Sequence, residues 1–340
     1  MTDTIRVGLD LAKTSFQVHG VNAQEQVTHR RSLRRGQVLD WFSKLAPCLI
    51  GMEACGTAHY WARELSKLGH TVRLIPPSYV KPYVRRNKND AADAAAICEA
   101  VSRPSMRFVA AKSEAQQAAT GVHRVRELLM KQRTAAMNNL RSLMAEFGIV
   151  AAQGTARIKD LLAIVDDSDD KRIPDPLRTA LVAQAAMLRS LERELETVDK
   201  ALAAWGRANK TCRHLNTIHG YGVVIATAMA AFVPNPAVFD SGRHCAASLG
   251  LVPRQDTTGG KVKLGPISKR GNGYLRRLLV NGALSVLSSK RAKEDPWLVK
   301  LLATKPRMVA AVAVANKMAR IGWAVMTRQE DFRPALTVAA

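Results

Sequence analysis

The chain carries the heptapeptide VGLDLAK at Val7–Lys13. Its first residues are apolar, and the pattern predicts a short buried strand over Ile5–Leu11 with Asp10 near its end. Burying an acidic side chain there is costly unless a cation partner compensates for it. The stretch therefore indicates an α/β domain with a candidate metal ligand at the end of its first strand.

Alternating and continuous apolar runs extend this α/β pattern through the first hundred residues. Short runs predict strands, and longer segments with helical spacing predict helices between and after them. The expected strands are Ser15–Val21, Glu25–Leu33, Cys48–Met52 and Thr71–Ile75, and the expected helices are Gly36–Leu45, His59–Leu68 and Asp90–Ala100.

Three further acidic residues occupy places where a metal site can form. Glu53 follows the apolar run Cys48–Met52 and so ends a strand, as Asp10 does. Asp90 and Asp93 lie three residues apart at a helix start and project from one face. Mg²⁺ prefers such oxygen ligands, and two ions about 3.5–4 Å apart suit phosphodiester chemistry. Singly, each acid is more simply a turn former, a surface residue, a helix N-cap or a first-turn charge; their joint occurrence favours the metal site.

The middle of the chain reads as long helices. Residues 113–147 have amphipathic spacing, with Ser113 as the expected N-cap. Farther along, a leucine stands at every seventh position, namely Leu181, Leu188, Leu195 and Leu202. This repeat predicts a coiled coil of about three heptads. Because three heptads are the minimum for a coiled coil, a helical hairpin packed within one chain explains the repeat equally well.

Positive charge is concentrated in the last third of the chain. Lys and Arg number 51 against 28 Asp and Glu, for a formal net charge of +23. Residues 207–340 carry 21 basic and 6 acidic side chains, and within 241–293 the basic residues number 11 against the single Asp256. Such an excess repels itself unless a polyanion is bound, so a nucleic acid is the expected partner.

The sequence offers little support for a membrane protein, a secreted protein or a zinc protein. The longest apolar run, near Met308–Ala315, is shorter than the ~18 residues of a membrane span, and no signal pattern precedes the first strand. The 5 cysteines form no CxxC or Cys/His cluster, so neither a disulfide framework nor a zinc site is indicated. We therefore expect a protein of the cytoplasm or nucleoid without a membrane partner. Separately, the apolar spacing around Trp297 and Trp323 predicts that both lie in the core.

Glycine-rich and basic motifs fill the C-terminal third. The sequence TIHGYG at Thr217–Gly222 precedes an apolar helix and resembles a helix-hairpin-helix, in which the backbone around Gly220 and Gly222 meets a phosphate. An ordinary glycine turn between helices is the alternative. Farther on, LGLVPRQDTTGG at Leu249–Gly260 leads into PISKRGN at Pro266–Asn272 and then into LRR.

These motifs resemble a known family when taken in order. GLDLAK, GMEACGT and KNDAADA look like the DEDD signature of a RuvC-like (RNase H-like) domain. That domain occurs in the bridge-RNA-guided DEDD recombinases, a family of bacterial insertion-sequence transposases. The four acidic positions match, and so does Lys88. GLVPR, GG, ISKRG and LRR resemble the C-terminal transposase domain of the same family, so the resemblance covers nearly the whole chain.

The resemblance implies a three-part organisation. An α/β RuvC-like domain is expected over 1–157 and a helical, coiled-coil linker over 158–205. A mostly α-helical C-terminal transposase domain with a helix-hairpin-helix-like start is expected over 206–340. The family's helical linker accommodates the leucine heptads.

The resemblance to this family also implies a mechanism. The four carboxylates would hold Mg²⁺, a bridge RNA would pair with donor and target DNA, and a homodimer or homotetramer would join the strands. In the family, a serine before the glycine-rich turn attacks the DNA phosphate. Here Thr258 takes that position, which is a departure because its β-methyl group crowds the hydroxyl. Thr257 and Ser268 are the other candidates.

Basic residues around this nucleophile are natural phosphate contacts. The expected nucleic-acid contacts, besides Lys88, Gly220 and Gly222, are Arg254, Lys261, Lys263, Lys269, Arg270, Arg276 and Arg277.

Two alternative functions remain open. One is a metal-only endonuclease of the junction-resolving kind, and the other is a non-catalytic nucleic-acid-binding protein.

Overall fold

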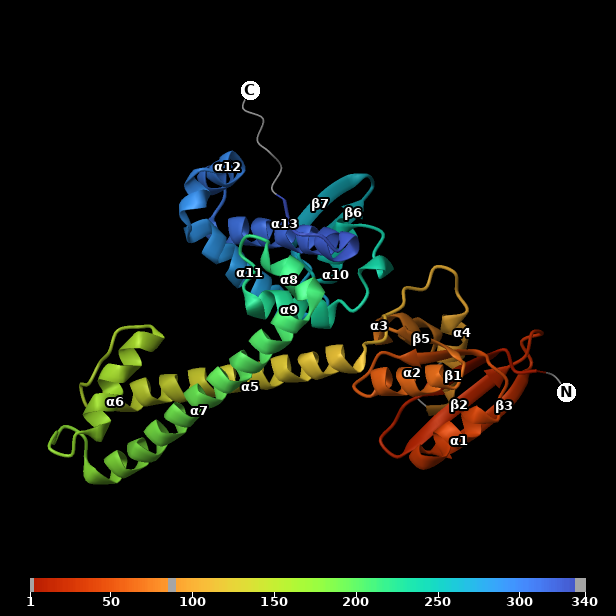
Figure 1. Cartoon of the computed structure of the whole chain (residues 1–340), viewed down its shortest axis with the longest axis horizontal. Helices are drawn as coiled ribbons and strands as arrows, with labels where there is room; N and C mark the ends of the chain where they lie inside the picture. Colours follow the sequence, from red (N-terminus) through yellow and green to blue (C-terminus); the bar gives the residue numbers. More distant parts are fainter. Residues whose placement is uncertain (1–2, 85–89, 334–340) are drawn as a thin grey trace. The chain divides into compact units, whose positions relative to one another are not determined.

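The computed structural model describes residues 3–84 and 90–333 (Figure 1). The chain packs into two compact units. The first runs through Gln117 and takes in Val233–Asp240, and the second holds Ala118–Phe232 and the chain from Ser241 onward. The predicted divisions at 157/158 and 205/206 stay predictions, and a single helix runs through the second of them, Asp175–Ala208.

A five-stranded mixed sheet forms the centre of the first unit, in the order β3-β2-β1-β4-β5 (Figure 1). The first three strands pair antiparallel, whereas β4 and β5 extend the sheet in parallel with β1. The strands are β1 (Arg6–Asp10), β2 (Ser15–Val21), β3 (Val27–Arg34), β4 (Leu49–Glu53) and β5 (Thr71–Ile75).

Helices cover both faces of this sheet. Val7 and Leu9 of β1 pack with α1 and α2 on one face, whereas Gly8 of β1 meets α4 on the other. Successive residues of a strand point to opposite faces, which explains this division. The helices are α1 (Val38–Ser43), α2 (Ala58–Lys67), α3 (Pro77–Val80) and α4 (Asp90–Val101), with short 3₁₀ turns at Arg35–Gln37 and Lys81–Tyr83.

The predicted α/β character of this region is confirmed, with shifts of one or two residues at several ends. Two strands, Ser15–Val21 and Thr71–Ile75, have the predicted bounds. The helix expected over Gly36–Leu45 is a 3₁₀ turn followed by α1.

The second unit is mostly helical, as expected, with one two-stranded sheet. Its first long helix begins within the residues of the first unit, where Ser113 caps it, because the Ser113 Oγ accepts a hydrogen bond from Gln116 N at 3.2 Å. Between the long helices lies a 3₁₀ turn at Thr155–Arg157. The elements are α5 (Glu114–Ala145), α6 (Ile158–Asp166), α7 (Asp175–Ala208), α8 (Lys210–Asn216), α9 (Val223–Phe232), α10 (Gly242–Ser248), β6 (Pro253–Thr258), β7 (Lys261–Ile267), α11 (Gly273–Ser288), α12 (Pro296–Thr304) and α13 (Arg307–Arg328).

The leucine heptads of α7 are buried within this single chain. Leu181 and Leu188 pack in one cluster with residues of α5 and α6, and Leu195 and Leu202 are buried as well. Gln184, the polar residue inside the repeat, donates a hydrogen bond to the Ala136 carbonyl oxygen of α5 at 2.7 Å. An intrachain helical hairpin therefore accounts for the heptad pattern without a second chain.

One described helix, α13, is long and apolar enough to cross a membrane by length and composition. Its apolar side chains pack against α10 and α11 in the core of the second unit. Burial against these neighbours explains its composition.

Candidate metal centre and nucleic-acid interface

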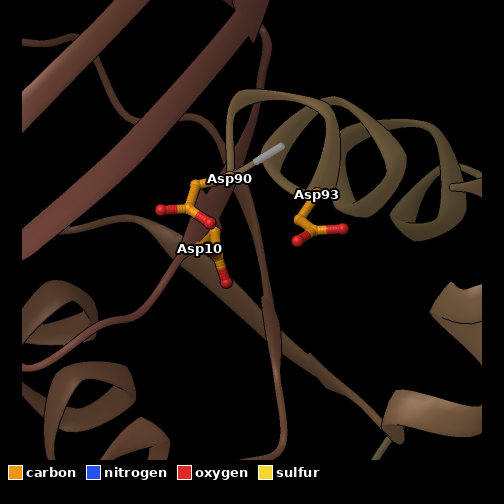
Figure 2. A group of neighbouring side chains, drawn as sticks. All are labelled: Asp10, Asp90 and Asp93. Atoms are coloured by element: carbon orange, nitrogen blue, oxygen red, sulfur yellow. The ribbon is translucent and has the colours of Figure 1, made fainter. Parts of the chain in front are cut away.

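Three carboxylates gather at one edge of the first unit's sheet (Figure 2). Asp10 is the last residue of β1, and Asp90 and Asp93 lie in the first turn of α4. One oxygen from each lies within 4.8 Å of the other two. Carboxylates this close repel one another, and a hard divalent cation relieves that repulsion with the oxygen ligands it prefers. The residues present therefore fit the implied metal.

Two glycines allow α4 to reach this edge. Gly8 of β1 and Gly51 of β4 are paired in register. A methyl group on Gly8 would lie 2.5 Å from the backbone nitrogen of Cys98, and one on Gly51 would lie 2.8 Å from Cβ of Val101, both in α4. We call this glycine pair the α4 seat. Because side chains two apart share a face of a strand, the carboxylate that ends each strand lies on the face covered by α4.

Glu53 is the fourth acid of the predicted set, and it lies outside the group of three. It ends β4, directly after the Leu9–Met52 pairing of β1 with β4. Burial raises the pKa of Glu53, and the negative charges of Asp10 and Asp93 raise it further. Glu53 therefore feels the same electrostatic field as the gathered aspartates. Lys88, also predicted here, lies outside the described residues.

The predicted nucleophile lies on an exposed β-hairpin of the second unit. Thr258 ends β6 and pairs with Lys261 of β7 across a turn of Gly259 and Gly260, whose φ angles are 56° and 75°. Glycine adopts such positive φ values without strain, so this two-residue turn favours glycine at both positions.

The register of the hairpin separates the two threonines. Thr258 pairs with Lys261 and therefore shares a face with it, whereas Thr257 pairs with the exposed Val262 on the opposite face. Gln255 donates a hydrogen bond to Thr257 Oγ1 at 3.0 Å. Thr258 thus lies on the basic face of the hairpin and Thr257 on the more apolar one.

The base of the hairpin is held by a close approach of two loops. A methyl group on Gly250 would lie 2.6 Å from Arg270 N, and one on Gly271 would overlap the Ser248 carbonyl oxygen. Ser268, the third nucleophile candidate, is partly buried beside β7, and its backbone N donates to Val252 O at 2.8 Å. The glycines of GLVPR and ISKRG therefore have a packing role.

Two of the predicted phosphate contacts have partners inside the chain. Arg276 Nη1 donates to the carbonyl oxygens of Leu249 at 2.9 Å and Arg270 at 2.8 Å. Arg277 forms an ion pair with Glu127 of α5. Both guanidinium groups therefore already have partners within the second unit. The other predicted cations are exposed, namely Arg254, Lys261, Lys263, Lys269 and Arg270.

The helix-hairpin-helix glycines differ in their surroundings. Gly220, with φ 82°, packs against α11, where an added methyl group would lie 2.6 Å from a Val286 methyl carbon. Gly222 is exposed just before α9, with open space around its Cα. The packing-turn alternative therefore accounts for Gly220, while phosphate binding at Gly222 stays a prediction.

Sequence reasoning missed the α4 seat and misplaced one aromatic residue. The signal for the seat was present as a repeated pattern, Gly8-Leu9-Asp10 and Gly51-Met52-Glu53. The expectation that Trp297 lies in the core is wrong, since 38% of it is exposed. It follows a proline at the start of α12, and helical spacing alone did not distinguish this surface position from a core one.

Comparison with known proteins agrees with both motif sets. A profile described as a transposase, of the DEDD type, matches residues 7–149, and a profile described as the transposase IS116/IS110/IS902 family matches 212–297. A probable family 20 transposase of Pseudomonas aeruginosa is 49% identical over 333 residues, which cover 97% of this chain and 98% of the relative.

Two transposases of named insertion sequences are also similar along nearly their whole length. That of element IS1328 from Yersinia enterocolitica is 38% identical, covering 98% of this chain and 99% of the relative. That of element IS1111A from Coxiella burnetii is 37% identical, covering 98% and 92%. With both motif sets matched in order, the chain belongs to the IS110/IS116 family of insertion-sequence transposases.

Proposed function

We propose that this transposase cuts and rejoins donor and target DNA at a centre built on Asp10, Glu53, Asp90 and Asp93. The observation that carries the proposal is the convergence of three of these carboxylates within 4.8 Å at the sheet edge. Bound there, Mg²⁺ would supply charge stabilisation at a scissile phosphate. The carboxylates hold the cation, and the α4 seat fixes the approach of the helix that carries two of them.

The proposed nucleophile is Thr258. Its Oγ1 forms a bond to phosphorus, the bond from phosphorus to one deoxyribose oxygen breaks, and the hydroxyl proton passes to solvent while the leaving oxygen gains one. The product is a covalent phosphodiester between protein and DNA, which conserves the bond energy for rejoining. Exposure of Thr258 at a hairpin tip, on the face shared with Lys261, supports access to a phosphate.

Partners complete the proposal. Donor and target DNA are bound through the basic C-terminal region, where 241–293 holds 11 basic residues against one acid. Guidance by a bridge RNA and assembly as a homodimer or homotetramer come from the resemblance to the bridge-RNA-guided recombinases. A cytoplasmic location is expected from the scattered cysteines, which form no cluster in the sequence. A coiled-coil contact between chains would have to use surfaces other than the buried heptad leucines.

The decisive test is to trap the covalent adduct. The purified chain is incubated with Mg²⁺ and DNA carrying the element's ends, and the attached residue is mapped by mass spectrometry. Asp10→Asn and excess EDTA should each abolish cleavage, because both remove the cation from the carboxylates. Asp40→Asn is the matched control, since Asp40 is an exposed acid of the same unit that pairs with Lys44.

The nucleophile is tested separately. Thr258→Ala should remove the adduct, while Thr257→Ala on the opposite face should keep it. Full cleavage by Thr258→Ala without any adduct would instead identify a metal-only endonuclease that uses water. Cleavage that persists in EDTA would reject the metal centre itself.

A further inference from the structure

A basic hollow of about 800 Å³ lies in the second unit, on the side of α13 that faces away from its buried stripe. The stripe of α13 that forms the floor includes Asn316, Lys317 and Arg320. The start of α10, with Arg243, and the first turn of α12, with Trp297, form its walls. We call these residues the α13 hollow. Most of its floor lies beyond residues 212–297, the stretch matched by the family profile.

The two faces of α13 are chemically distinct. Val314, Met318 and Val325 are buried in the unit's core. Lys317 and Arg320 point to the other side, three residues apart, and are exposed. Packing requires only the apolar face, so the core does not explain the basic stripe.

The ion pairs found between described residues do not include the cations of the hollow. These cations, Arg243, Lys317 and Arg320, are all exposed. The acid closest to Trp297 in sequence, Asp295, caps α12 by accepting hydrogen bonds from the backbone nitrogens of Trp297 and Leu298. Three positive charges around one hollow repel one another and attract a polyanion.

An exposed indole gives the hollow a second kind of recognition. Trp297 is 38% exposed, and Lys317 Nζ lies 4.1 Å from the centroid of its ring. Proteins that bind single-stranded nucleic acids combine cations along the backbone with aromatic rings on which bases stack. A duplex keeps its bases stacked inside, so an exposed indole beside phosphate-binding cations fits unpaired nucleotides better than a double helix.

We propose that the α13 hollow binds an unpaired stretch of nucleic acid, with phosphates at Arg243 and Arg320 and a base against Trp297. This contact is separate from the carboxylate centre and from the β6–β7 hairpin. Its role would be to hold a single strand during strand exchange or to hold an unpaired segment of RNA. Both ligands share the same chemistry of phosphate and exposed base.

The test measures binding of the full chain to labelled oligo(dT), oligo(U) and a duplex of equal length by fluorescence anisotropy at several salt concentrations. Arg243→Gln with Arg320→Gln should weaken single-strand binding about tenfold or more. It should also reduce the slope of log K against log salt by about 0.7 for each lost phosphate contact. Trp297→Ala should weaken binding about 5- to 100-fold with little change in that slope. Duplex binding should weaken much less than single-strand binding, because the other cations of 241–293 still contact the duplex backbone. Tighter binding of oligo(U) than of oligo(dT), or the reverse, identifies RNA or DNA as the source of the ligand.

Matched variants make the result specific. Arg328→Gln removes a cation from the same helix outside the hollow, where Arg328 pairs with Glu330, and should leave binding intact. Asp10→Asn should abolish cleavage yet keep single-strand binding, so failure of the catalytic proposal would not mimic failure here. If Trp297→Ala unfolds the chain, Trp297→Phe replaces it in the test. Because Trp297→Phe keeps an aromatic ring, it should retain most of the binding.

Two outcomes would overturn the proposal. One is unchanged single-strand affinity in the folded double-arginine variant. The other is an equal loss of single-strand and duplex binding, which would make the hollow a general basic surface.

Discussion

Gly8 and Gly51 set how closely α4 approaches β1 and β4. Each lies two residues before a carboxylate on the same strand face, and each leaves room that only a hydrogen atom fits. The absence of two methyl groups thus places Asp90 and Asp93 beside Asp10. A substitution at these positions would therefore shift the carboxylates of the candidate metal centre without contacting any of them.

Gly8→Ala is the prediction at this scale. The added methyl group forces α4 away from β1, so the free energy of unfolding should fall by about 1–3 kcal/mol and cleavage should drop sharply. Thermal unfolding and the Mg²⁺ concentration needed for half-maximal cleavage measure the two effects. Gly56→Ala is the control, because an added methyl group meets nothing within 4 Å there. A Gly8→Ala chain with unchanged cleavage would show that α4 does not need this seat.

At the scale of elements, α5 and α7 form a helical pair within one chain. Leu188 of α7 is 2% exposed and packs against α5 and α6, whereas its neighbour Met187 is 49% exposed. Two adjacent residues on one helix therefore separate the inner face from the outer face.

Leu188→Glu should destabilise this pair strongly, because a carboxylate there is buried without a partner. We expect a loss of about 3 kcal/mol or more in the free energy of unfolding, against less than about 1 kcal/mol for Met187→Glu. Denaturant unfolding measures the difference, and sedimentation shows whether either variant changes the assembly. If Leu188→Glu is as stable as Met187→Glu but sediments as a smaller species, the leucines lie between chains.

Elements could be predicted where burial leaves a periodic trace. β1, β2, β4 and β5 follow apolar runs, and their core contacts explain why. The hairpin β6–β7 leaves no such trace, because β6 is exposed along its whole length and β7 nearly so. The Gly259-Gly260 turn alone marked it. The heptads were ambiguous because a period of seven fits packing within one chain or between two.

The four acids of the candidate site could be predicted from the sequence, but their arrangement could not. Strand ends and helix starts indicated Asp10, Glu53, Asp90 and Asp93, yet only the fold shows Glu53 outside the group of three. For the cations, residue type did not reveal that Arg276 and Arg277 bind partners inside the chain. Chain composition records charge but not which charges are already compensated.

At the scale of the whole molecule, the two units have different internal supports. The first relies on a sheet with helices on both faces, and the second on helices that meet around His123. Nδ1 of His123 lies 3.1 Å from the Tyr274 hydroxyl of α11, and its ring centroid lies 5.9 Å from that of Phe232 in α9. Burial, with the nearby positive charge of Arg126, lowers the pKa of His123 to about 4.

This buried histidine predicts acid sensitivity of the second unit. Above pH 7 the imidazole is neutral in both states, so no stability is lost. Below the ordinary pKa of 6.5, His123 is protonated in the unfolded chain, whereas in the folded chain it stays neutral down to about pH 4. The free energy of unfolding should therefore fall by up to about 3 kcal/mol across this window. Unfolding at pH 7 and pH 5 should differ less in His123→Gln, and an equal difference would contradict the assignment.

The α4 seat has a consequence for building such centres elsewhere. Asp90 and Asp93 travel together on one helix, so three gathered carboxylates come from only two rigid pieces. Their assembly therefore depends on how one helix is placed on two neighbouring strands, and the two glycines allow that helix to come close. The same arrangement could be designed into another α/β scaffold. Gly-x-Asp and Gly-x-Glu would stand in register at the ends of two parallel strands, and a helix that starts with Asp-x-x-Asp would cover them.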